Sequence, residues 1–253
     1  MHSKKKAGSQ VLDRLSSVSP KATVILSGSF DGPADKHPEL ALGAIKVITE
    51  WSLLESVLLS LFVKMLGANP APGAAMYAAL TGPAAQNSAL LALAKLSFSH
   101  DNYELFHAVL EMQKSTAKKT NKLVHWVWHY SAELPDAALL CNPKDILQHK
   151  VELKSWMDNG SNGPEPILPN KNIVVVRIRD LHEIFEEVRH LILLFMCLEM
   201  VLNGMDSPLS TPLRTLSLEP AIQKELSRRR QHQRTAQEVQ RQSPSQDRSE
   251  NED

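Results

Sequence analysis

The chain has 253 residues, which is enough for one large domain or two small ones. Hydrophobic residues make up 43% of it, so a sizeable core is expected, whereas the 28 basic and 28 acidic residues balance and indicate no class of partner. The longest apolar run, 191–198, is far shorter than the roughly 20 residues of a membrane-spanning helix, and no apolar stretch follows the basic N-terminus. The composition therefore predicts a cytoplasmic protein without a membrane segment.

Residues 1–37 are rich in glycine, proline, serine and aspartate, which favour turns, so this segment is expected to be loosely ordered. The first long helix is predicted over 38–66, because Gly67 and Pro70 provide a stop. At about 100° per residue its polar side chains form one narrow stripe, which predicts burial of the helix on most sides. The stripe consists of Lys46, Glu50 and Lys64.

Glu55 interrupts the apolar part of this helix, where it projects among large hydrophobic side chains. A buried carboxylate without a partner is costly, so Glu55 should be paired, protonated or close to water. Two interpretations remain. Glu55 makes a structural hydrogen bond or ion pair with another helix, or it is a supporting carboxylate that lines a functional site.

The middle of the chain predicts a short helix over 74–80 and longer ones over 83–97 and 102–130. Two short apolar segments follow, AALLC at 137–141 and NIVVVRIR at 172–179, and both are bounded by turn-forming residues. They are expected to pair as a two-stranded ribbon. The segment between them is compatible with helix and with extended structure.

The last core helix is predicted from Asp180, a capping residue, to about 203–204, and its second half is apolar all round, which predicts central burial. Residues 205–253 form a polar tail that is expected to be largely disordered apart from a polar helix or coil over 219–240. The fold class is therefore all-α. We expect a bundle of about four to five helices over 38–204, with the ribbon before its last helix.

The basic centre of the tail, KELSRRRQHQR at 224–234, has two interpretations. A solvated segment is the simpler one, and binding of nucleic acid is the alternative. The chain contains no glycine-rich phosphate loop, no G-x-S-x-G elbow and no H-E-x-x-H motif. Cys141 and Cys197 lack metal-ligand spacing and are best interpreted as reduced thiols, and no acidic ligand accompanies His125 and His129. The sequence therefore predicts no metal and no other cofactor.

The stretch STAKKTNKLVHWVWHY at 115–130 carries the strongest functional signal. On a helix over 102–130, Asn121 and His125 are neighbours at i, i+4 on the polar side, opposite the apolar stripe. The same side carries His107, Glu111, Lys114, Lys118, Lys122 and His129, with Trp128 at its margin. Lysines bind phosphate, histidine transfers a proton near neutral pH, asparagine orients an imidazole or binds a base, and tryptophan stacks on bases. The pattern indicates a candidate RNA site, and an ordinary solvated face is the alternative.

A tryptophan and a glutamate in EWSLLE, followed on a later helix by TNKLVHWVW and a Pro/Asp turn, resemble the HEPN superfamily of bacterial helical proteins. Its motif is an arginine, usually followed by a polar residue such as asparagine, and then a histidine. The resemblance implies a helical bundle and a dimer in which two motifs meet at a shared cleft. It also implies metal-independent cleavage of RNA in toxin–antitoxin and defence systems, or an inactive binding module.

Asn121 and His125 match the polar residue and the histidine of this motif, whereas Thr120 stands at the arginine position. Lys119, one place earlier, points toward the core side of a regular helix. A guanidinium that binds phosphate through two hydrogen bonds is therefore missing from the motif. The sequence favours a non-catalytic or weakly active RNA-binding or interaction module that forms a homodimer or binds a cognate protein.

The alternative is a metal-independent endoribonuclease that uses His125. In that hypothesis His125 is the general acid or base, and Asn121 orients it or the substrate. The remaining candidate residues are Lys118 and Lys122 for phosphate, Trp128 for a base and Glu55 as a supporting carboxylate.

Overall fold

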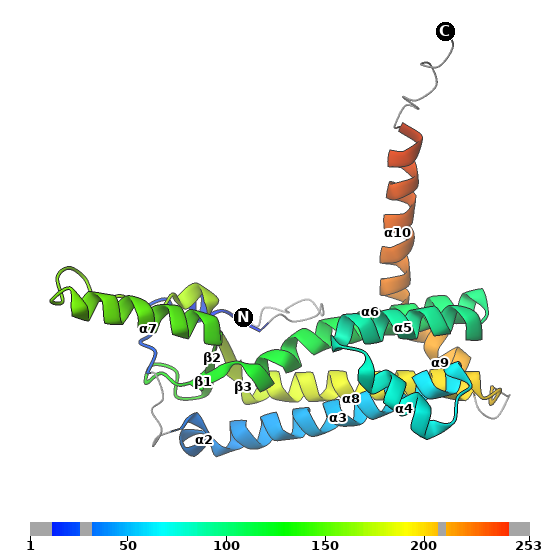
Figure 1. Ribbon diagram of the computed structural model, residues 1–253, viewed down its shortest axis with the longest axis horizontal. Coiled ribbons are helices and arrows are strands. Elements are labelled where there is room, and N and C mark those ends of the chain that lie inside the picture. The colour runs from blue at the N-terminus through cyan, green and yellow to red at the C-terminus, as the bar shows by residue number, and fades with distance from the viewer. Residues whose placement is uncertain (1–11, 26–31, 207–210, 243–253) are drawn as a thin grey trace, which may run out of the picture. The chain divides into compact units, whose positions relative to one another are not determined.

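A computed structural model describes residues 12–25, 32–206 and 211–242 of the chain. This part of the protein contains ten α-helices, α1 to α10, and three β-strands (Figure 1). The chain divides into two compact units. Unit 1 consists of residues 1–58 and 113–193, and unit 2 of residues 59–112 and 194–253.

Unit 1 contains an antiparallel sheet with the strand order β1-β2-β3. The predicted pairing of 137–141 with 172–179 is confirmed, because β2 (Ala137–Cys141) pairs with β3 (Val174–Arg177). The prediction of two strands is wrong, since β1 (Val127–His129) pairs with the other edge of β2. Strand β1 takes the place of the last turn predicted for the helix over 102–130. Its β-branched and aromatic residues fit a pleated surface at least as well as a helix.

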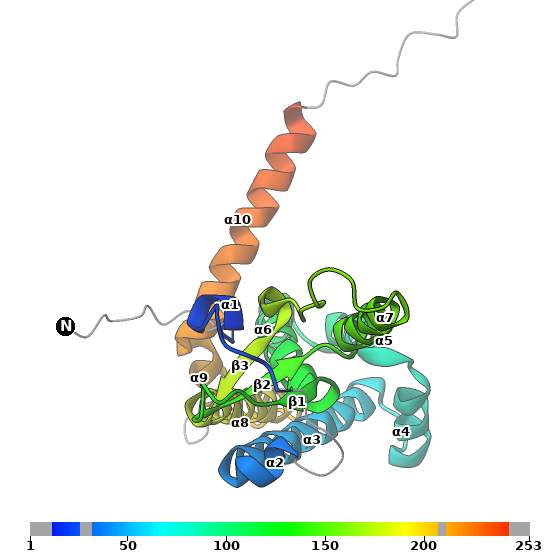
Figure 2. The ribbon, with the colours of Figure 1, turned by 90° about the vertical axis from the view of Figure 1, so that its left-hand side faces the viewer.

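Residues 12–25 add to this sheet, although they belong to the segment expected to be loosely ordered. The amide of Leu15 donates to the carbonyl of Ile173 at 2.9 Å, and the amide of Ile25 donates to the carbonyl of Tyr130 at 2.9 Å. Helix α1 (Leu15–Val18) begins directly after Arg14 and lies beside β3 (Figure 2). Leu15 is fully buried in an apolar cluster with β2 and β3 residues. Residues 1–11 and 26–31 of that segment lie outside the described residues.

The other helical parts of unit 1 are α2 (Pro33–Lys36), the first part of α3 (Pro38–Leu66), α7 (Pro143–Asp158) and the first part of α8 (Ile178–Leu202). A short 3₁₀ helix, η1 (Asn170–Asn172), precedes β3. Helix α7 begins where Asn142 caps it by accepting a hydrogen bond from the Lys144 amide at 3.0 Å. Gly43 lets α3 approach α8, because a Cβ atom there would lie 3.0 Å from Leu181 Cδ1. The segment between β2 and β3 was compatible with helix and with extended structure, and it forms α7 and η1.

Helix α3 is buried on one side only, which contradicts the predicted burial on most sides. Its inward residues include Leu40, Val47 and Leu54, each at most 1% exposed. On the opposite side Leu42, Ile45 and Leu53 are 55%, 59% and 50% exposed. The apolar composition of the helix therefore exceeds what the described part of the chain covers. The same holds for the second half of α8, where Leu193 and Met196 are exposed.

Unit 2 contains α4 (Pro70–Ala79), α5 (Gly82–Ser97), the first part of α6 (His100–His125) and the ends of α3 and α8. Phe106 of α6 is fully buried, and its ring centroid lies 5.8 Å from that of Phe98 and 6.1 Å from that of Phe195. Glu199 of α8 forms an ion pair with Lys64 and accepts a hydrogen bond from Ser60 Oγ at 3.1 Å. These contacts join the end of α8 to α6 and to the end of α3, and they place the residue that follows α5 beside α6.

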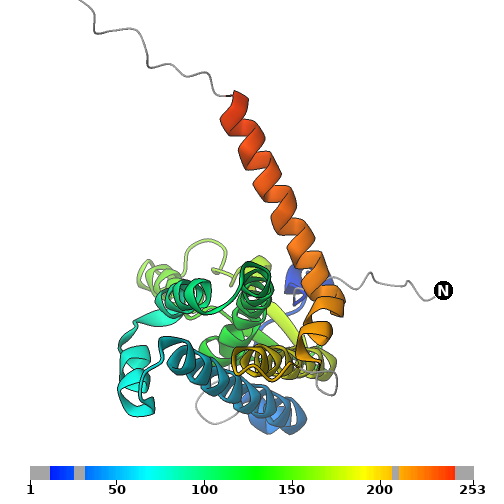
Figure 3. The same cartoon turned by 90° about the vertical axis from the view of Figure 1, so that its right-hand side faces the viewer.

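Helix α9 (Pro212–Leu218) belongs to the region predicted as a largely disordered tail, whereas α10 (Pro220–Gln242) agrees with the polar helix or coil predicted over 219–240. The long helix α10 is drawn orange to red in Figure 3. Leu216 and Ile222 are fully buried and Leu226 is nearly so, which gives this region a packed apolar side. Residues 243–253, which were also expected to be disordered, lie outside the described residues.

Within the described residues, no single helix has both the length and the hydropathy of a membrane span. The bent pair of α3 and α4, with an angle of 115° between the two helices, meets the criterion only when both are taken together, by length and composition.

Candidate functional site

The last two turns of α6 carry most of the residues that the sequence singled out. Lys118, Asn121 and His125 are exposed, and Lys122 is half-buried. Their spacing of three, four and seven residues places them on one side of the helix. These four residues are called the α6 face from here on. His125 is the last residue of α6, and the backbone becomes extended from Val127 onward in β1.

The opposite side of α6 is packed against α8 within unit 1. Lys119 is 8% exposed, and its Nζ lies 2.6 and 2.8 Å from the two carboxylate oxygens of Glu187. Thr116 Oγ1 donates to the same carboxylate at 3.3 Å. The prediction that Lys119 points toward the core is confirmed. Glu187 was missed, although an acidic residue beside the apolar positions of a core helix is a signal for a buried cation nearby.

Thr120, at the arginine position of the motif, is 1% exposed and donates its hydroxyl to the Thr116 carbonyl at 3.2 Å. A cation at this position would be buried beside Lys119, which already carries a charge. The polar side of α6 therefore obtains no charge from position 120. The cations of the α6 face are Lys118 and Lys122, and neither forms an ion pair with a carboxylate within the described residues.

The two tryptophans after the motif have different surroundings. Trp128 is half-buried on β1, and its Nε1 donates to the Leu123 carbonyl at 3.0 Å. Trp126 lies between α6 and β1, and Lys122 Nζ is 5.1 Å from the centroid of its ring. This distance is within the range of a cation–π contact. Trp126, which the sequence analysis did not select, is therefore the aromatic ring in direct contact with the α6 face.

Glu55 lies on α3 and is exposed. Its carboxylate accepts a hydrogen bond from Trp51 Nε1 at 2.9 Å, one turn earlier on the same helix. Across the described ranges, no hydrogen bond or ion pair joins Glu55 to Asn121 or His125. Glu55 therefore has a local partner and an exposed side chain, and no such contact joins it to the α6 face within the described residues.

His129 was predicted on the polar side of the long helix together with His125, and this placement is wrong. It lies on β1, is almost fully buried, and pairs across the sheet with Leu139 on the side of the apolar cluster. Burial lowers the pKa of His129, and the nearby charge of Lys150 on α7 lowers it further. His125 and His129 are thus separated by the end of the helix, and an i, i+4 metal pair does not form.

The lowered pKa of His129 predicts a loss of stability in acid. The unfolded chain takes up this proton near the ordinary value of 6.5, before the folded chain does. The free energy of unfolding should therefore fall as the pH drops below about 6.5, until the folded pKa is passed. We expect urea denaturation to show this fall between about pH 7.5 and 5.5, and a smaller fall in His129→Gln. An unchanged pH profile in that variant would contradict the assignment.

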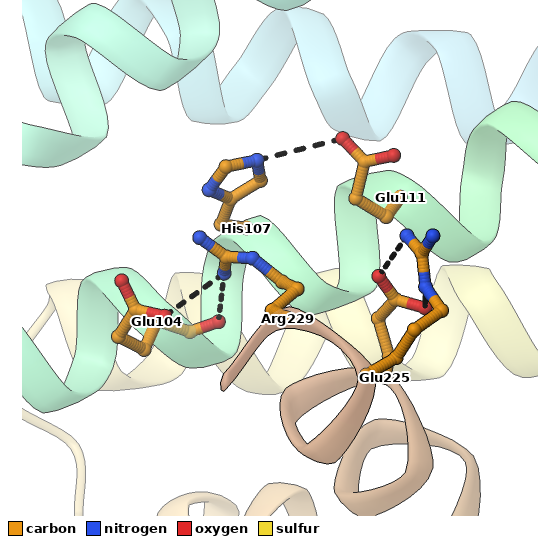
Figure 4. A network of polar contacts seen from close by, with 6 residues as sticks. Glu104, His107, Glu111, Glu225 and Arg229 are labelled. Carbon is orange, nitrogen blue, oxygen red and sulfur yellow. Dashed lines mark hydrogen bonds and ion pairs between the residues drawn. The ribbon is translucent and has the colours of Figure 1, made fainter. Parts of the chain in front are cut away.

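The basic segment 224–234 is partly neutralised by its own surroundings in unit 2. Figure 4 shows Arg229 of α10 directed at Glu104 of α6, with the closest ion-pair distance at 3.0 Å. Arg228 binds Glu225 through two hydrogen bonds of 2.9 and 2.6 Å, which raise its pKa. Among the described residues, the cations of the segment that form no ion pair are Lys224, Arg230 and Arg234. Two arginines of this segment, Arg228 and Arg229, are therefore engaged in ion pairs within unit 2.

Within the described residues, no group of three or more His, Cys, Asp or Glu side chains is arranged to hold a metal. Cys141 and Cys197 are both free, and burial raises the pKa of the Cys141 thiol to about 12. A thiol with such a pKa is a poor nucleophile. In the part of the chain that the structure describes, the α6 face with Trp126 combines exposed cations, an imidazole and an aromatic ring, and it is the candidate ligand site. Comparison with protein-family models, with curated proteins and with solved structures finds no match to this chain.

Proposed function

We propose that the chain binds single-stranded RNA through the α6 face and acts as a non-catalytic or weakly active module of the HEPN-like kind. One observation supports this most directly. Lys118 and Lys122 flank an exposed Asn121–His125 pair, and within the described residues no carboxylate neutralises them. We also propose that the module acts in the cytoplasm, and the resemblance of the motif suggests a role in a bacterial toxin–antitoxin or defence system.

The chemistry of the α6 face fits an unpaired strand better than a duplex. Lysines bind phosphates of any nucleic acid, but an amide side chain and an aromatic ring need accessible base edges and faces. Asn121 is exposed beside the lysines, and Trp126 is in contact with Lys122. The absence of a cation at Thr120 leaves His125 without a fixed guanidinium beside it, which argues against efficient catalysis.

Binding should be measured by fluorescence anisotropy with a labelled single-stranded RNA over a series of salt concentrations. Each phosphate contact contributes about −0.7 to the slope of log K against log salt, so the two lysines predict a slope of about −1.4 or steeper. Duplex RNA of the same sequence is the matched control ligand. A flat salt response, or equal affinity for the duplex, would contradict the proposal.

Cleavage of RNA is the alternative function, and the exposed imidazole of His125 one turn from Asn121 is the observation in its favour. We expect at most slow cleavage of single-stranded RNA, with no effect of EDTA and with cyclic phosphate ends. His125→Ala should abolish it, while Lys154→Ala on α7 should not. Cleavage that persists in His125→Ala would exclude His125 as the acid or base.

A protein partner is a second part of the proposal, and it is supported by the outer side of α3. Leu42, Ile45 and Leu53 are half or more exposed on that side. On the same side the hydroxyls of Thr49, Ser52 and Ser56 donate to carbonyls four residues earlier, at 2.9 to 3.1 Å. The side therefore presents mainly apolar surface with small residues, which suits a second helix. We propose that a second copy of the chain covers it.

The mass of the protein in solution tests this contact. The natural chain should be a dimer by light scattering, and Ile45→Asp should shift it toward the monomer because a buried charge without a partner is costly. Leu96→Asp, at an apolar position on α5 that is 85% exposed, is the matched control. A natural chain that is monomeric at all concentrations would exclude the second copy.

A further inference from the structure

Arg14 is a cation that the proposed site has not yet used, and strand register determines its place. Arg14 forms a β-bridge with Val174, Val174 pairs with Leu140, and Leu140 pairs with Trp128. Residues directly opposite each other in antiparallel strands project from the same side of a sheet. Arg14 therefore projects from the side that carries Trp128.

This side of the sheet is the one that meets α6. Trp128 donates its indole N–H to the Leu123 carbonyl, which lies two residues before the end of the helix. The alternate residues Leu15, Ile173 and Cys141 belong to the apolar cluster on the other side. Arg14 is exposed and lies on the side of the sheet that meets α6, away from that cluster, at the edge of the sheet opposite to β1.

The backbone on both sides of Arg14 is held in place. The amide of Leu15 donates to the Ile173 carbonyl at 2.9 Å, and the carbonyl of Asp13 accepts from the Val175 amide at 2.9 Å. The Leu15 side chain is fully buried. Arg14 consequently projects from an anchored strand position, so little backbone entropy is lost when its side chain binds a ligand.

Electrostatics agrees with this placement. The pKa of Lys122 is lowered, first by burial and then by the positive charge of Arg14. Neither side chain has a carboxylate partner within the described residues. Two neighbouring cations without an anion repel each other, and this repulsion destabilises the folded protein. An anion bound between them is attracted by both charges and removes that destabilisation.

We propose that Arg14 and Lys122 together bind one phosphate group at the end of α6. The planar fork of Arg14 can donate two parallel hydrogen bonds to phosphate oxygens, and the Lys122 ammonium supplies a second charge beside Trp126. In this way the sheet adds a guanidinium for phosphate binding at Lys122, whereas position 120 of the motif still supplies no cation beside His125. That the phosphate belongs to an RNA strand rests on the proposed function, since inorganic phosphate or a nucleotide offers the same chemistry.

The phosphate site can be tested without RNA. In Arg14→Gln the pKa of Lys122, followed by NMR of ¹³C-labelled lysine, should rise because a neighbouring positive charge is lost. Inorganic phosphate should raise the melting temperature of the natural chain by about 2 °C over chloride at equal ionic strength. The same shift should appear in Lys154→Gln, the matched control, and disappear in Arg14→Gln. An unchanged Lys122 pKa, or an equal phosphate effect in all three proteins, would overturn the proposal.

Binding of RNA provides the second arm of the test. Arg14→Gln and Lys122→Gln should each weaken binding about tenfold, the magnitude of one lost charge-assisted contact, and reduce the salt slope by about 0.7. The double variant should lose less than the product of the single losses, because both side chains contact the same phosphate. Unchanged RNA affinity in Arg14→Gln would overturn the proposal. If the natural chain binds phosphate through Arg14 but has no affinity for RNA, the proposed function fails and the phosphate site stands.

Discussion

Replacing both Lys118 and Lys122 by glutamate is expected to weaken the binding of single-stranded RNA at least about 100-fold at roughly 0.1 M salt. The change removes two phosphate contacts and adds two negative charges to the α6 face, so attraction becomes repulsion. Lys118 is exposed and Lys122 only half-buried, so neither substitution should disturb the core. Anisotropy with labelled RNA measures the affinity, and circular dichroism checks that the helices remain.

The control for this variant needs the same change in net charge at a distance from the α6 face. Lys46→Glu on α3 combined with Lys154→Glu on α7 provides it, because both lysines are exposed in unit 1. Little loss is expected in the control. Equal losses in the two double variants would mean that RNA responds to the overall charge of the protein, and the α6 face would lose its assignment.

Glu187→Ala is expected to lower the free energy of unfolding by about 2–3 kcal/mol. It leaves the ammonium of Lys119, which is 8% exposed, without its partner. We place the effect at the lower end for a buried pair, because the Glu187 side chain is itself 35% exposed. Urea denaturation at neutral pH measures the change. Glu183→Ala, whose exposed contact with Arg179 spans 3.8 Å, should cost less than about 0.5 kcal/mol.

A double replacement distinguishes a structural ion pair from a functional one. Lys119→Met with Glu187→Leu should recover most of the stability, because no buried charge remains unpaired. RNA binding should be unchanged in it, since Lys119 lies on the side of α6 opposite to the α6 face. A loss of binding in a stable double variant would contradict that separation.

Local pattern was sufficient for the long helices and for the ribbon. Helix α3 ends just before Gly67, which has a φ of 65°, as a C-terminal glycine permits. The segments 137–141 and 172–179 are short, apolar or β-branched, and bounded by turn-forming residues, which predicts strands. The predicted end of α6 at residue 130 was wrong, because Val127 and Tyr130 continue the apolar spacing of the helix. Only the pairing of β1 with β2 shows that the chain is extended there. Burial of Leu15 depends on the same long-range contacts.

The candidate site shows the same limit. Helical periodicity placed Asn121, His125 and two lysines on one side of α6, and it placed Lys119 on the other. Nothing in that periodicity includes Arg14, which reaches the site through a bridge to Val174, 160 positions further along the chain. The same periodicity selected Trp128 instead of Trp126, because it assigned both residues to one helix. The side of Glu55 was misjudged because apolar neighbours were taken as buried, whereas that side of α3 is open.

A single residue, Trp126, separates the last residue of α6 from the first residue of β1. Such a short junction has almost no freedom to absorb movement, so fraying of the final helical turn should disturb the strand as well. A ligand that steadies His125 and Lys122 should therefore slow amide hydrogen exchange beyond the helix, through β1 to the amide of Ile25, which is bonded to the Tyr130 carbonyl. Occupancy would then be detectable at a backbone position that no ligand touches.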